Sequence, residues 1–129
     1  MISGDTIVAQ ATPFGYSGTA LIRISGPSSA DILTKLTEMC VFAPRVSTYS
    51  KIKSKDNNTI DKALVVLYPA PASYTGENVV EISPHGNPSI ITDIIETICS
   101  FGARLAEPGE FTRRAFINGK MDLIQVEGV

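Results

Sequence analysis

The sequence predicts an α+β domain with a mixed sheet and two main helices, in which the helices and the sheet form separate layers. Two observations support this class: segments of strand character alternate with two apolar helical stripes, and a polar turn joins two of the strands in a clear hairpin. The chain has 129 residues, of which 43% are hydrophobic and 19% charged. This length and composition fit one folded globular domain with a sizeable core.

Two strands are expected near the N-terminus. Residues 5–11 are rich in Thr, Ile, Val and Ala and end at Thr12-Pro13, which marks a turn. Residues 14–18 continue that turn, and a second strand is predicted over 19–25. Arg23 interrupts the apolar residues of this strand, so its side chain either faces water or points into a site.

The first helix is predicted to begin at Ser28, where Ser can cap the helix and Asp31 follows three residues later. An apolar stripe at helical spacing then predicts a core-facing side, formed by Ile32, Leu33, Leu36, Met39 and Cys40.

The hairpin is predicted from arms at 48–54 and 59–68 around the polar turn 55–58. Lys51, Lys53 and Lys55 alternate along its first arm, which is typical of an edge strand protected from aggregation and less typical of a nucleic-acid patch. Since the net charge is −2, any contact with a polyanion would need such a local basic patch.

A further strand is predicted over 78–83, with Val80 and Ile82 on one face and Glu81 on the other. Asn87-Pro88 then begins the second helix as N-cap and first residue. Its apolar stripe consists of Ile90, Ile91, Ile94, Ile95 and Ile98, Gly102 ends it, and a short strand is expected over 103–106.

The stretch 107–122 holds the densest group of chemically useful residues. After the turn at Pro108-Gly109, a short helix is predicted with Phe111, Ala115 and Ile117 on one side, so that Glu110, Arg113 and Arg114 face elsewhere. Asn118-Gly119 is expected to cap this helix, which would hold Lys120 at a fixed backbone corner. Two interpretations follow: an anion site, or a capped surface helix with solvated charges.

Several classes of function lack the residues they need. Cys40 and Cys99 are the only cysteines, so both are expected to be reduced core thiols, and a zinc cluster has no ligands. There is no GxxxxGK[ST] phosphate loop and no signal peptide or membrane span. Ser83, His85 and Asp93 could be combined into a triad, but His85 is more simply a loop residue. The sequence thus indicates a cytosolic binding module with no membrane contact.

Four blocks, in order, resemble one family. They are DTIVAQATP at 5–13, LIRISG at 21–26, YTGENVVEI at 74–82 followed by HG at 85–86, and PGEFTRRAFINGKMDL at 108–123. Together they are similar to the N-terminal domain of the MnmE (TrmE) family of tRNA modification GTPases. The chain departs from the usual family pattern at Tyr16, where a basic residue is expected.

The resemblance implies a fold similar to that of tetrahydrofolate-binding aminomethyltransferases. It also implies a homodimer that binds 5-formyltetrahydrofolate or a related reduced folate, with Arg23, Glu81 and Lys120 as the cofactor-binding residues and no catalytic or metal-binding residue. These residue types suit the ligand, because a carboxylate can accept two bonds from the pterin edge while cations meet a carbonyl or the glutamyl tail.

The resemblance further divides the chain into a folate-binding and dimerisation domain at 1–118 and the truncated start of a helical domain at 119–129. Asp122 is expected to be the N-cap of a helix in this second part. In such proteins a separate G domain binds GTP, Mg and K, and the flavoprotein MnmG (GidA) is the partner in forming 5-carboxymethylaminomethyl-type modifications on the wobble uridine of tRNA. Two alternatives stay open: a stand-alone aminomethyltransferase-like folate enzyme, and a dimerisation or RNA-positioning scaffold without a ligand.

Overall fold

The computed structural model describes residues 4–12, 15, 17–39 and 42–120. Its main sheet has six strands in the order β4-β5-β6-β3-β1-β8, and a small second sheet pairs β2 with β7. Neighbouring strands are antiparallel except β1 and β8, which are parallel, so the predicted mixed sheet is confirmed. The strands are β1 Ile7–Gln10, β2 Ser17–Thr19, β3 Ile22–Ser25, β4 Thr48–Lys53, β5 Thr59–Tyr68, β6 Val79–Ser83, β7 His85–Gly86 and β8 Arg104–Leu105.

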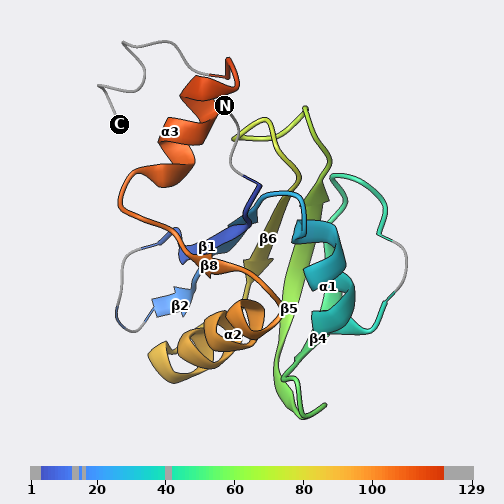
Figure 1. Ribbon diagram of the computed structural model, residues 1–129. Coiled ribbons are helices and arrows are strands. Elements are labelled where there is room, and N and C mark those ends of the chain that lie inside the picture. The colour runs from blue at the N-terminus through green and yellow to red at the C-terminus, as the bar shows by residue number, and fades with distance from the viewer. Residues whose placement is uncertain (1–3, 13–14, 16, 40–41, 121–129) are drawn as a thin grey trace.

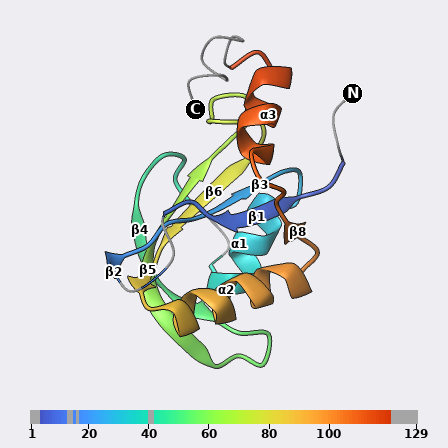
Figure 2. The same ribbon diagram turned by 90° about the vertical axis from the view of Figure 1, so that its left-hand side faces the viewer.

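Within the described residues, three helices accompany the sheet: α1 Ser29–Thr37, α2 Pro88–Ser100 and α3 Glu110–Ile117. The first two pack on the sheet, α1 against β4 and β6 and α2 against β1 and β5, and α3 stands apart from them at one end of the molecule (Figure 1; Figure 2). The main core lies between the sheet and these two helices, and among the described residues α3 contributes none of its members. The α+β class is therefore confirmed, while the likeness to aminomethyltransferases stays a prediction.

The hairpin, the 78–83 strand and the second helix form where the sequence predicts them. The hairpin arms are β4 and β5, joined through the polar turn. Asn87 caps α2, since its Oδ1 accepts a hydrogen bond from the Ser89 amide at 2.9 Å. Ile91, Ile94 and Ile98 are buried on the side of α2 that faces the sheet. Local propensity and periodicity thus suffice for these elements.

The first half of the chain differs from the prediction in three places. The strand predicted over 19–25 divides into β2 and β3, because the Ala20 amide leaves the main ladder and donates to the Pro84 carbonyl. Ser28 precedes α1 but makes no side-chain cap, and its own amide donates to Thr6 Oγ1 at 2.9 Å. Since α1 ends at Thr37, Met39 falls beyond the helix.

The predicted loop at His85 is instead the two-residue strand β7, and the His85 ring pairs with Asp61 rather than with Asp93. Burial opposes ionisation of Asp61, but hydrogen bonds from His85 outweigh it and lower the pKa of this carboxyl. Cys99 is a half-buried free thiol whose pKa is raised by burial and by Glu96. The predictions made for Cys40, Phe14, Tyr16 and Asp122 lie outside the described residues.

Candidate functional site

Arg23 and Glu81 face each other on the sheet surface opposite α1 and α2. They are direct cross-strand partners in the β3–β6 ladder, and strand alternation turns them away from the core residues Ile24 and Val80. Arg23 Nε and Nη2 each lie 3.0 Å from Glu81 Oε2. The pair is about four-fifths buried, with 21% and 22% of the two side chains exposed.

Two aromatic rings hold the Arg23 guanidinium in place. Its Cζ lies 4.9 Å from the centroid of Tyr74 and 5.8 Å from that of Phe111 in α3. Both distances suit cation–π attraction, which favours the charged guanidinium against an aromatic face. The Tyr74 hydroxyl is in turn 3.0 Å from Thr112 Oγ1, so the loop before β6 is joined to α3 beside the guanidinium.

This arrangement forms one wall of a cavity of about 910 Å³, called the Arg23 pocket below. The pocket lies between the end of β1, the chain leading into α3 and α3 itself. Its lining is Ala9, Gln10, Ala11, Arg23, Tyr74, Ala106, Glu107, Pro108, Gly109, Phe111, Thr112, Arg113 and Phe116. A largely apolar cavity of this size with a few polar groups is typical of a site for a small organic ligand.

The helix that closes the pocket is oriented differently from the prediction. Its buried side consists of Glu110, Arg114 and Ala115, whereas Ile117 is 52% exposed and Phe111 faces Arg23. The prediction that the charged residues face away from the side of Ala115 was therefore wrong for Glu110 and Arg114. Burying them is possible because opposite charges from distant parts of the chain meet them.

Glu110 is paired with Arg104, which follows α2. Arg104 Nη1 and Nη2 donate to the two Glu110 oxygens at 2.9 and 2.6 Å, and the Glu107 amide donates to Glu110 Oε1 at 2.9 Å. The bonds from Arg104 outweigh the burial of the carboxyl and lower the pKa of Glu110 to about 2. Glu110 is thus a carboxylate throughout the neutral and mildly acidic range.

Arg114 joins α3 to two other segments. Its Nη2 donates to Asp5 Oδ1 at 2.7 Å and its Nη1 to the Asp5 carbonyl at 3.0 Å. The same Nη1 lies 3.0 Å from Glu77 Oε1, and Nη2 lies 3.3 Å from Glu110 Oε2. Asp5, Glu77, Arg104, Glu110 and Arg114 are called the Arg114 cluster below. Burial lowers the pKa of Arg114, but the bonds to Glu77 and Asp5 outweigh this and raise it.

The C-terminal end of α3 forms the predicted cap. Gly119 has φ +75°, its amide donates to the Phe116 carbonyl, and the Lys120 amide donates to the Ala115 carbonyl at 2.7 Å. These are the two bonds of a Schellman motif. Asn118 also donates through Nδ2 to the Thr75 carbonyl at 2.8 Å, which fixes the end of α3 on the loop before β6.

The structure brings together two of the three predicted ligand-binding residues. Arg23 lines the pocket, and Glu81, which is not among the described lining residues, is its ion-pair partner. Lys120 is exposed and is not among the described residues that line the pocket. It follows Phe116, which does line the pocket, by four residues, and lies beside Gly76.

Sequence reasoning missed Tyr74 and Phe111 as partners of Arg23, and it missed the Arg114 cluster. The spacing of Glu110 and Arg114 was the available signal, because residues four apart on a helix can pair on one face. The four motif blocks are connected through side-chain contacts at α3. Each block contributes one residue to these contacts: Asp5, Ser25, Glu77 and Arg114, in the order of the blocks. Ser25 Oγ donates to Glu77 Oε1 at 2.6 Å and so connects β3 to the cluster.

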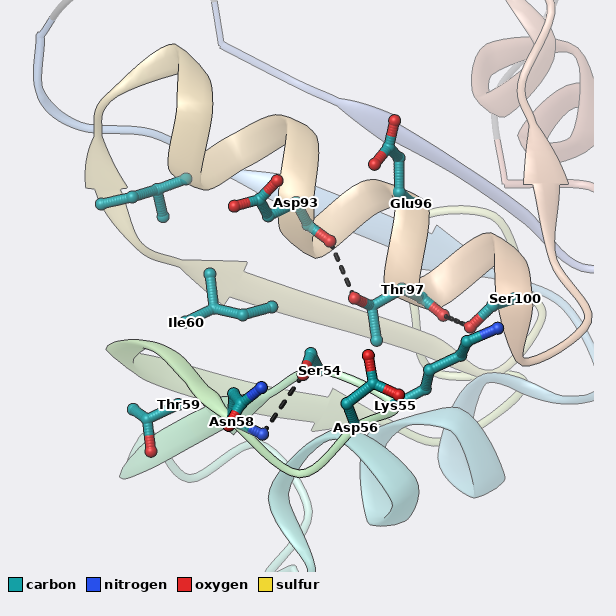
Figure 3. A pocket seen from close by; sticks show the side chains of 11 residues that line it. Ser54, Lys55, Asp56, Asn58, Thr59, Ile60, Asp93, Glu96, Thr97 and Ser100 are labelled. Atoms are coloured by element: carbon teal, nitrogen blue, oxygen red, sulfur yellow. Dashed lines mark hydrogen bonds between the residues drawn. The ribbon is translucent and has the colours of Figure 1, made fainter.

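A second cavity, of about 560 Å³, lies between the hairpin tip and α2 (Figure 3). Asp93, Glu96 and Thr97 of α2 border it on one side, and Lys55 and Asp56 of the hairpin turn on the other. Thr97 and Ser100 already donate to carbonyls of their own helix. This cavity has mixed charge and lacks an aromatic side chain among its described lining residues, so it is a weaker candidate for a ring-shaped ligand.

Two further observations concern other kinds of site. Within residues 4–12, 15, 17–39 and 42–120, no group of three or more His, Cys, Asp or Glu side chains is arranged to hold a metal ion. In the same residues, none of the helices has the length and apolar character required to span a membrane.

The fold and the Arg23 pocket define an α+β domain with a cavity suited to a small organic ligand. The chain belongs to the family described as GTP-binding protein TrmE N-terminus, whose family model matches residues 6–120.

Curated relatives of this chain are named tRNA modification GTPase MnmE. The chain is 50% identical over 129 residues to one from Francisella tularensis subsp. holarctica and 43% identical over 125 residues to one from Halorhodospira halophila. The alignments include 100% and 97% of this chain but only 28% and 26% of those relatives. The chain therefore spans little more than a quarter of the length of the proteins it matches.

Proposed function

We propose that this chain is the folate-binding and dimerisation domain of a tRNA modification GTPase, and that the Arg23 pocket receives 5-formyltetrahydrofolate or a related reduced folate. The observation that supports this most is the placement of Arg23. Its guanidinium lies within cation–π distance of two aromatic rings at the edge of a largely apolar cavity of about 910 Å³.

The chemistry of a reduced folate matches this cavity. The molecule has a pterin ring system and an aromatic ring, which stack on aromatic side chains, and Tyr74, Phe111 and Phe116 supply such surfaces around the pocket. It also has a ring carbonyl and an anionic glutamyl tail. Arg23, with its planar set of donors, is suited to bind either of these oxygen-bearing groups.

Glu81 retains an acceptor for the ligand while it pairs with Arg23. Both contacts from the guanidinium go to Oε2, so Oε1 can accept a bond from an N–H of the pterin edge. Arg23 also supplies the opposite charge that Glu81 needs beside an apolar surface, where an isolated carboxylate would be costly. In this proposal Arg23 and Glu81 bind the pterin together.

Lys120 is proposed to meet the glutamyl tail. It follows Phe116 of the pocket wall by four residues, just beyond the Gly119 cap of α3, and is exposed. A flexible ammonium in this place suits a charged tail that extends into water, where screening limits the gain in binding free energy to about 1 kcal/mol or less. Lys120 therefore adds less affinity than Arg23 and Glu81.

The proposal extends to assembly as a homodimer. Leu105, Phe116 and Ile117 are 63%, 42% and 52% exposed, and all three belong to β8 and α3 beside the pocket. Exposed large apolar side chains favour association with another protein surface. A second copy of this chain covering them would also close the pocket.

For the whole protein, we propose the activity stated in the names of the relatives: modification of tRNA coupled to GTP hydrolysis. GTP, Mg and K would bind to a G domain outside these 129 residues, the partner would be the flavoprotein MnmG, and the reaction would take place in the cytoplasm. The folate in the Arg23 pocket would supply the one-carbon unit.

Calorimetric titration of the chain with 5-formyltetrahydrofolate tests the binding function, and an assay for aminomethyl transfer tests the rival enzyme function. Saturable binding without transfer supports the proposal. Transfer by this chain alone would establish a stand-alone folate enzyme, and the absence of binding would leave a scaffold. Sedimentation at high micromolar concentration, expected to show a dimer, tests the assembly.

A further inference from the structure

The Arg114 cluster docks the helix that forms one wall of the Arg23 pocket. The main core lies on the other face of the sheet, and none of the described α3 residues belongs to it. Instead, α3 is attached through charged groups: Arg114 to Asp5 and Glu77, and Glu110 to Arg104. The attachment therefore depends on ion pairs more than on apolar packing.

Arg114 has the central position in this attachment. Its side chain is 7% exposed and contacts three carboxylates, from the segment before β1, the loop before β6 and α3 itself. Three carboxylates around one site repel each other unless the guanidinium is present between them, and a buried charge left without its partner is strongly destabilising. Removing Arg114 therefore opposes docking of α3.

Docking of α3 sets the geometry around Arg23. Phe111 is on the same helix, three residues before Arg114, and covers the Arg23 guanidinium from that side. Thr112 holds Tyr74, the second ring near the guanidinium, through the hydroxyl contact of 3.0 Å. If α3 moves away from the sheet, Arg23 loses Phe111 and the fixed position of Tyr74 together.

We propose that Arg114 is the positioning residue of the Arg23 pocket: it holds α3 in the ligand-competent position without itself contacting the ligand, and ligand binding in turn favours the docked helix. The proposal rests on the proposed function for the identity of the ligand. A ligand that binds only the docked state shifts the population toward it, and its apparent Kd rises as the docked fraction falls. If Arg114→Gln leaves about one molecule in ten docked, the apparent Kd rises about tenfold.

The experiment compares the chain with its Arg114→Gln and Arg114→Lys variants, with Lys35→Gln as a control that removes an exposed cation from α1. Three quantities are measured: the affinity for 5-formyltetrahydrofolate, hydrogen exchange of the α3 amides against those of β3 and β6, and the NMR resonance of the Arg23 Nε–H, which the two rings shift. Asp5→Asn weakens the same cluster at a residue whose side chain is 41% exposed, so it supplies the comparison if Arg114→Gln does not fold.

Faster exchange confined to α3, a displaced Arg23 resonance and weaker binding in Arg114→Gln, with partial recovery in Arg114→Lys, would support the proposal. Exchange that rises equally in β3, β6 and α3 would overturn it, as would an unchanged Arg23 resonance or an unchanged affinity with α3 undocked. If the unmodified chain does not bind the folate, the proposed function fails, while the exchange pattern and the Arg23 resonance still decide whether Arg114 positions the pocket.

Discussion

Arg23 of β3 and Glu81 of β6 are 58 residues apart in sequence and directly opposite each other in the sheet, with two guanidinium nitrogens each 3.0 Å from one carboxylate oxygen. Arg23 is also one of the residues that line the Arg23 pocket. The ion pair thus connects the sheet to the cavity, and the following predictions test that connection and the elements that support it.

Glu81→Gln should weaken binding of 5-formyltetrahydrofolate by roughly 1.5–3 kcal/mol, because the side chain keeps its size but loses the charge that an N–H donor of the pterin edge would face. Calorimetric titration measures the change. Thermal unfolding of the variant measures separately what loss of this ion pair, which is about four-fifths buried, costs the fold. Affinity equal to that of the unmodified chain would exclude a role for Glu81 in pterin recognition.

Gly119→Ala should lower the free energy of unfolding by about 1 kcal/mol, because Gly119 has φ +75° in the cap of α3 and a Cβ there strains the backbone. No atom lies within 4 Å of that Cβ position, so the cost arises from backbone conformation alone. Gly18→Ala, where a Cβ also meets nothing within 4 Å, is the matched control in thermal unfolding. Equal stability of the two variants would argue against the cap.

The two N-caps of the long helices differ in a way that mutation can detect. Asn87→Ala should destabilise the fold by about 1 kcal/mol, because it removes the acceptor for the Ser89 amide at the start of α2. Ser28→Ala should have little effect, since the Ser28 side chain makes no cap at the start of α1. Denaturant unfolding measures the free energy of unfolding of both variants. A larger loss of stability in Ser28→Ala than in Asn87→Ala would contradict the prediction.

Much of the fold could be predicted from sequence, because local patterns determine it. The hairpin turn, the cap at Asn87 and the isoleucine stripe of α2 each act over a few residues. The orientation of α3 could not be predicted, since apolar periodicity places Phe111, Ala115 and Ile117 on one side of the helix, and of these only Ala115 is buried. Arg114 is buried instead because Asp5 and Glu77, 109 and 37 residues away, meet it in the folded chain. Similarly, the sequence identifies Arg23 and Glu81 as site residues but does not predict that they form an ion pair. That pairing depends on β3 and β6 being neighbours in the sheet.

Acid should weaken the attachment of α3 through Glu110. Its pKa is about 2 in the folded chain against an ordinary value of 4.5. Because the unfolded state binds the proton more tightly, this carboxyl stabilises the fold fully above pH 4.5, and the stabilisation decreases as the pH falls toward 2. The effect is at most about 3 kcal/mol.

Denaturant unfolding at a series of pH values tests this for the chain and for Glu110→Gln. The variant should lose less stability between neutral pH and the acid range, since it has no proton to bind at this position. Glu96→Gln, at an exposed position of α2, serves as the control and should follow the unmodified chain. Parallel pH profiles for Glu110→Gln and the unmodified chain would contradict the assigned ion pair.

The central claim, that the Arg23 pocket binds a reduced folate, is tested most directly by an NMR titration of the chain with 5-formyltetrahydrofolate that follows each residue separately. The account predicts saturable shifts at Arg23 Nε–H, Tyr74 and Phe111, with the residues of the second cavity, such as Asp93 and Thr97, unchanged. Shifts confined to the cavity between the hairpin and α2, or no saturable shift at any residue, would contradict it.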